Sequence, residues 1–90
     1  MKMCKRCVVS GKVQGVYFRQ ATLDQANALG ITGWVRNLGS GDVECLVCGE
    51  IDNVEAMCEW LWEGPPAARV QDVAIEDLPW QEYTTFMIRK

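Results

Sequence analysis

The order in which strand-like and helix-like patterns follow one another most restricts the fold of this chain. Alternating apolar residues predict strands, and apolar residues repeated every three or four positions predict helices. By this criterion the chain contains strand, helix, strand, strand, helix and strand, in that order, followed by a short additional strand. The expected ranges are residues 3–10, 17–29 (with residue 18 as an alternative start), 31–37, 43–48, 52–63, 70–75 and 85–89.

Glycines and capping residues mark the ends of the predicted helices. Gly30 directly follows the apolar stripe of the first helix, a position typical of a helix C-terminus. Asp52 and Glu55 form a D-x-x-E pattern, which predicts a capping box at the start of the second helix. Gly64 and the two prolines after it predict where that helix ends. The glycine-rich turn "LGSGD" between the second and third strands predicts a hairpin over residues 31–48.

This order of elements is that of a ferredoxin-like βαββαβ sandwich, a fold of the α+β class. We expect an antiparallel sheet of strand order 4-1-3-2, with both helices on one face and the short fifth strand at an edge. The other face would then meet solvent or a partner. A chain of 90 residues has room for a single domain, 1–90. The fold alone does not specify a function, because this sandwich hosts many.

Composition excludes several classes of function. The chain contains no histidine, which removes imidazole acid–base chemistry, Ser–His–Asp triads and metal sites that use histidine. No apolar run approaches the roughly 18 residues that span a membrane. The basic N-terminus is followed by "VVSGKVQG", which is not the apolar core of a signal peptide. We therefore expect a cytoplasmic protein without a membrane partner.

Charge is distributed unevenly along the chain. Residues 1–23 hold five basic side chains and no acidic one, whereas the remainder holds four basic and twelve acidic side chains, for a net charge of −3. An acidic protein is a poor candidate for nucleic-acid binding, which requires a basic face. A basic segment in an acidic protein better suits a small anion bound at one place. Within it, Lys2, Lys5 and Arg6 are expected to be solvated strand residues.

The turn between the first strand and the first helix is the candidate anion site. Gly11 and Gly15 allow positive φ angles or close backbone approach, so that successive N–H groups can converge at the start of the helix. Arg19 lies in the first turn of that helix, where its guanidinium group could complete a cradle for a tetrahedral anion. The stretch is neither a P-loop nor a G-x-G-x-x-G motif. An ordinary turn with an exposed Arg19 is the alternative.

Two motifs resemble the signatures of acylphosphatases, small enzymes that hydrolyse carboxyl phosphates. "GKVQGVYFR", residues 11–19, is similar to the first signature, and "GWVRN", residues 33–37, is similar to the second. The resemblance implies that Asn37 orients the attacking water; Leu38 departs from members that carry a hydroxyl residue there. It also implies that the phosphate is bound by the loop of residues 14–19, namely Gln14, Gly15, Val16, Tyr17, Phe18 and Arg19.

The resemblance implies a chemistry that needs neither metal nor cofactor. A carboxylate is a good leaving group, so the phosphoryl group has only to be positioned, stabilised and attacked by an in-line water, without a covalent intermediate. Asn37 shares strand parity with the apolar Val35, so it should point toward the layer that contains Arg19. We expect an acyl phosphate as substrate, inorganic phosphate or sulfate as a competing anion, and a monomer. A similar loop in hydrogenase-maturation proteins belongs to much longer chains.

The cysteines suggest a second hypothesis, a zinc-binding module. Cys4 and Cys7 form one C-x-x-C pair and Cys45 and Cys48 form another. On strands, however, residues three apart point to opposite faces. If the first and third strands pair with Cys4 opposite Cys48, then Cys7 lies opposite Cys45. Cys4 and Cys48 would then share the open face within disulfide range, and Cys7 and Cys45 would face the helices. Cys58 is expected in the core.

Overall fold

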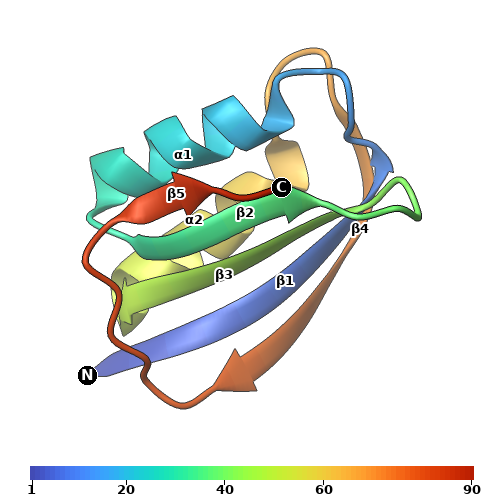
Figure 1. The fold of residues 1–90 in the computed structure, drawn as a ribbon. Helices are drawn as coiled ribbons and strands as arrows, with labels where there is room; N and C mark the ends of the chain where they lie inside the picture. The colour runs from blue at the N-terminus through green and yellow to red at the C-terminus, as the bar shows by residue number, and fades with distance from the viewer.

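The computed structural model describes residues 1–90 and contains five strands and two helices (Figure 1). The sheet has the strand order β4-β1-β3-β2-β5, in which only β2 and β5 are parallel. The predicted ferredoxin-like order 4-1-3-2 with a short fifth strand at the edge is confirmed. The elements are β1 (Lys2–Lys12), α1 (Phe18–Leu29), β2 (Thr32–Asn37), β3 (Val43–Glu50), α2 (Ile51–Glu63), β4 (Arg69–Leu78) and β5 (Phe86–Ile88).

Both helices cover the same face of the sheet, and the core lies between them and the strands (Figure 1). Alternate strand residues supply one side of this core, among them Val9 and Val35, and the helices supply the other. The rings of Phe18 in α1 and Trp60 in α2 pack 5.9 Å apart and join the two helices. Neither helix has the length and apolar composition needed to cross a membrane.

Strands β1 and β3 pair in the predicted register. Cys4 lies opposite Cys48, and Cys7 lies opposite Cys45. Because side chains alternate along a strand, the first pair lies on the face away from the helices and the second lies in the core. The face assignments of all four residues are therefore confirmed, and Cys58 is also in the core, as expected.

Several predicted boundaries are wrong: β4 ends at Leu78 and not at residue 75, and two further differences lie in β1 and α2. Strand β1 continues through Gly11 to Lys12, beyond a register shift at residues 10 and 11, so the turn begins only at Val13. Gly11 has a φ of 121°, and a Cβ there would collide with the main chain of β4. Helix α2 begins at Ile51, directly after β3, with Glu50 as an N-cap residue that makes no side-chain capping bond. The capping box predicted at Asp52 is therefore absent.

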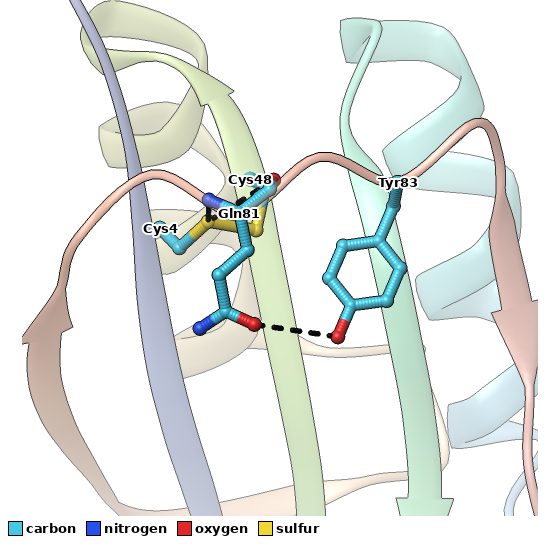
Figure 2. The surroundings of a disulfide bond; sticks show 4 residues. All are labelled: Cys4, Cys48, Gln81 and Tyr83. Atoms are coloured by element: carbon cyan, nitrogen blue, oxygen red, sulfur yellow. Dashed lines mark hydrogen bonds between the residues drawn. A yellow bond between two sulfur atoms is a disulfide. The ribbon is translucent and has the colours of Figure 1, made fainter.

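The face away from the helices is not left entirely open. Residues 79–85, which we call the strap, connect β4 to β5 and cross this face, as Figure 2 shows at Gln81 and Tyr83. The strap covers a small apolar cluster of Cys4, Leu46 and Cys48, against which Tyr83 packs. The expectation that this face would meet solvent or a partner is wrong for this part of the sheet.

A charged cluster occupies the same face farther along the strands. Glu44 is 3% exposed, and its carboxylate accepts hydrogen bonds from Arg6 Nε at 2.5 Å and Arg36 Nε at 2.6 Å. Burial raises the pKa of Glu44, but the hydrogen bonds from the two arginines lower it by more, so the pKa lies below its ordinary value. Arg6 was expected to be a solvated strand residue; its side chain is 42% exposed, and it also pairs with this buried acid. On the helix-covered side of β1, Lys5 pairs with Asp77 at 2.7 Å.

Candidate active site

The loop that connects β1 to α1 has an unusual backbone. Gly15 has a φ of 73°, and Tyr17, which precedes the first residue of α1, has φ 64° and ψ 23°. Tyr17 is the only non-glycine residue of the chain with a positive φ. No side chain caps the start of α1. The main-chain N–H groups at the start of α1 are therefore not satisfied by a capping side chain, as such groups are in many other helices.

The N–H groups around the start of α1 have no partners in the protein. None of those of residues 15–20 donates a hydrogen bond to the main chain or to a side chain, and the first one that does is Ala21 N, to Tyr17 O at 3.0 Å. Unpaired donors at a helix N-terminus carry a partial positive charge and favour an anion. These unpaired donors lie where the glycine-rich turn predicted an anion site.

Arg19 and Asn37 line one pocket beside these donors. The pocket has a volume of about 390 Å³, and Asn37 reaches it from the last position of β2. Arg19 forms no ion pair, and no acidic side chain lines the pocket, so its positive charge is not neutralised from within the protein. The lining residues are Val13, Gly15, Tyr17, Phe18, Arg19, Gln20, Asn37 and Ile88.

Two residues of the expected phosphate loop do not line this pocket. Val16 is buried in the core. The side chain of Gln14 turns instead toward the β2–β3 hairpin, where Nε2 donates to the carbonyl oxygens of Leu38 at 2.8 Å and Asp42 at 2.9 Å. Gln14 therefore ties the loop to the segment that follows Asn37.

The amide of Asn37 contains an unpaired atom. Its Oδ1 is buried and has no hydrogen-bond partner. A buried polar atom without a partner is costly, and at a lined pocket such an atom is a natural position for a ligand or a water. Val35, two residues before Asn37 on β2, is fully buried in the core. Because alternate residues of a strand share a face, the side chains of Val35 and Asn37 both lie on the helix-covered side.

Comparison with known proteins places the chain in a family. A sequence profile of the acylphosphatase family matches residues 5–88. The chain is also 48% identical over 89 residues to an acylphosphatase of Nitrosococcus oceani, which covers 99% of this chain and 100% of that protein. The chain belongs to the acylphosphatase family. It is accordingly a hydrolase, and the activity of its class is acyl phosphate hydrolysis.

Solved acylphosphatase structures share the fold along nearly the whole chain. The structure of an acylphosphatase from Coxiella burnetii superimposes with a TM-score of 0.94 at 48% identity, covering 98% of this chain and 93% of that one. The crystal structure of acylphosphatase from Bacillus subtilis gives the same TM-score at 30% identity, covering 98% and 99%. The acylphosphatase fold is thus maintained here at both levels of sequence similarity.

The four cysteines of the two C-x-x-C pairs in this acylphosphatase chain cannot surround one metal ion, because the sheet separates Cys4 and Cys48 from Cys7 and Cys45. Cys4 and Cys48 form a disulfide beneath the strap, where Gln81 N donates to Cys4 Sγ at 3.2 Å (Figure 2). Cys7 lies on the other side of the sheet, with its Sγ 3.7 Å from that of Cys58. The thiol contact with Cys7, together with burial, raises the pKa of Cys58, which makes it a poor thiolate ligand. The zinc-module hypothesis has no geometric support.

Sequence reasoning missed two features of the candidate site of this acylphosphatase chain. The side chain of Gln14 has a structural contact of its own, which its assignment as a main-chain donor did not include. Ile88 was placed only in a short strand and not at the site. Both contacts join segments that are far apart in the sequence, so no local pattern indicates them.

Proposed function

We propose that this chain hydrolyses acyl phosphates by binding the phosphoryl group at the start of α1 and by placing a water with Asn37. The observation that carries the proposal is a run of unpaired donors beside one pocket. The main-chain N–H groups of residues 15–20 and the guanidinium of Arg19 lack partners in the protein. A dianionic group is the ligand that such donors favour.

The phosphoryl group would be held by charge and geometry. The N–H groups of the loop and of the first turn of α1 would donate to its equatorial oxygens, and Arg19 would add a charged donor. Because these donors are already oriented, they stabilise the charge of the transition state without reorganising during the reaction. The absence of an acidic neighbour at Arg19 leaves its charge available to the substrate.

The attacking water would be held by Asn37. Asn37 lines the pocket and its amide oxygen has no partner in the protein, so the side chain keeps unused hydrogen-bonding capacity for a water that enters the site. An amide can also donate through Nδ2, and two such contacts would fix the water opposite the leaving group. Gln14 supports this arrangement by donating a hydrogen bond to the carbonyl oxygen of Leu38, the residue that follows Asn37.

The chemical step then needs little further assistance. The oxygen of water forms a bond to phosphorus while the bond from phosphorus to the carboxyl oxygen breaks, and the carboxylate leaves with the electron pair. A phosphate oxygen of the substrate accepts the proton of the water. The products are a carboxylate and inorganic phosphate, without a covalent enzyme intermediate. Since the leaving group is a weak base, the reaction requires neither a general acid nor a divalent ion.

The proposal is tested by hydrolysis of benzoyl phosphate with and without a chelator. We expect rapid turnover that the chelator leaves unchanged and that inorganic phosphate inhibits competitively. Hydrolysis in heavy-oxygen water should place the label in the phosphate and not in the benzoate, since the water attacks phosphorus. Label in the benzoate, or turnover that a chelator abolishes and a divalent ion restores, would contradict the mechanism.

A further inference from the structure

The pocket contains an apolar part that the proposed phosphate site does not use. Its volume of about 390 Å³ lies in the range of sites that enclose small organic ligands, so it has room for more than a phosphoryl group. Half of its lining is apolar: Val13, Tyr17, Phe18 and Ile88. Val13 and Phe18 are buried in the core, which leaves Tyr17 and Ile88 as apolar side chains that a ligand can cover.

Tyr17 occupies its position without a structural benefit from its ring. Tyr17 is 84% exposed and its hydroxyl takes part in none of the hydrogen bonds of the protein, so the ring contributes little to packing. Its backbone is left-handed, a conformation that glycine or asparagine adopts at lower cost. A large aromatic side chain that is exposed at a strained position beside an anion cradle is better explained by ligand contact than by stability.

Ile88 faces the pocket from the opposite end of the chain. It lies in β5, opposite Val35 of β2, and the N–H of Arg89 donates to the carbonyl of Val35 at 2.8 Å. This pairing fixes Ile88 on the same side of the sheet as Phe86, which is in the core. Ile88 is nevertheless 39% exposed, so the strand holds a partly solvated apolar side chain at the site.

We propose that Tyr17 and Ile88 bind the acyl group of the substrate and make apolar, especially aromatic, acyl groups the preferred ones. This inference rests on the proposed function, because it needs the phosphoryl group in the cradle. A single bridging oxygen joins that phosphoryl group to the acyl carbon, so the acyl group must lie beside the cradle. Tyr17 is part of the cradle and Ile88 shares its pocket, and burial of apolar surface against them favours a larger apolar group.

The test is the ratio of kcat/KM for benzoyl phosphate to kcat/KM for acetyl phosphate, measured for the wild-type protein and for two variants. Tyr17→Asn removes the ring and keeps a residue that tolerates the left-handed backbone, and Ile88→Thr keeps a β-branched residue in the strand. We expect each variant to lower the benzoyl-to-acetyl ratio by about five- to twentyfold, the scale of a lost apolar contact. Because both substrates use the same phosphate cradle, damage to the cradle cancels in the ratio.

Two further variants serve as controls. Tyr17→Phe should keep the wild-type ratio, since the hydroxyl has no partner, and so should Trp62→Ala, which removes an exposed aromatic residue of α2 outside the pocket. A ratio that stays within twofold of wild type in Tyr17→Asn or in Ile88→Thr would overturn the acyl site. If the wild-type protein hydrolysed neither substrate, the proposed function itself would fail.

Discussion

The side-chain amide of Gln14 donates a hydrogen bond to the carbonyl oxygen of Leu38, with 2.8 Å between Nε2 and the oxygen. The same nitrogen also donates to Asp42 at 2.9 Å. These bonds connect the loop before α1 with the hairpin after β2, and Asn37 directly precedes Leu38. The donors that would hold the phosphoryl group and the amide that would hold the water are therefore linked by a single side chain.

We predict that Gln14→Met, which keeps the length of the side chain and removes its donors, lowers kcat by about tenfold. The physical reason is a small displacement of Asn37 relative to the cradle, to which a positioned reaction is sensitive. Loss of two hydrogen bonds should also lower the free energy of unfolding by about 1–2 kcal/mol. Steady-state kinetics and urea denaturation measure the two effects. Gln71→Met, at an exposed position of β4, is the control, and a wild-type kcat for Gln14→Met would argue against the positioning role.

Arg19→Ala should abolish turnover and also weaken competitive inhibition by inorganic phosphate. The guanidinium would contact the bound ground state as well as the transition state, so its loss affects both binding and rate. The inhibition constant for phosphate should rise at least about tenfold, in line with the loss of one charge-assisted hydrogen bond. Circular dichroism should show a folded protein, because Arg19 forms no internal ion pair. Unchanged phosphate affinity would exclude Arg19 from the cradle.

Asn37→Ala should separate rate from binding. Its amide would contact mainly the water, so the inhibition constant for phosphate should remain near the wild-type value. Turnover should nevertheless fall by about two to three orders of magnitude, the scale of one oriented group removed from a transition state. The measurement is kcat and phosphate inhibition of the folded variant. If kcat were retained, Asn37 would be only the residue that begins the hairpin turn.

The disulfide between Cys4 and Cys48 can be tested by peptide mapping without reduction. In an oxidised sample we expect this one bridge, and Cys7, Cys45 and Cys58 should react with a thiol reagent after denaturation. Reduction of the bridge should lower the free energy of unfolding by about 2–4 kcal/mol, because it closes a long loop. In a reducing cytoplasm the thiols would be the default state. A bridge that joined Cys4 to Cys7 or to Cys58 would contradict the β1–β3 register, in which Cys4 lies opposite Cys48.

Glu44→Gln should lower the free energy of unfolding at pH 7 by about 1–3 kcal/mol, since Arg6 and Arg36 lose the charge of their shared partner. The pKa of Glu44 lies below its ordinary value in the folded protein. Its contribution is therefore complete above the unfolded pKa of about 4.3 and is lost as the pH falls through the folded value. Denaturation at pH 7 and pH 3 should show that the difference between wild type and variant narrows at the lower pH. A difference that is constant with pH would contradict the role of the carboxylate.

The sequence predicts the parts of this fold that depend on periodic patterns. The strand order and the Cys4–Cys48 register follow from alternation and from the order of elements. The strap has no such pattern, because irregular segments are placed by tertiary contacts, and the pairing of Glu44 with Arg6 joins residues 38 positions apart. The expected capping box at Asp52 failed because β3 continues without a break into α2. Local signals do not report these long-range relationships.

The unpaired N–H groups of residues 15–20 belong to the main chain, and an exchange of side chains leaves such groups in place. Alanine scanning would therefore detect Arg19 and overlook most of the donors around it. Only a change that rotates the backbone, such as replacement of Gly15 with its φ of 73°, or chemical conversion of an amide to an ester, would reach them. If the proposed acyl site is correct, side chains such as Tyr17 can diverge during evolution and change which acyl groups are accepted, while the main-chain donors stay in place.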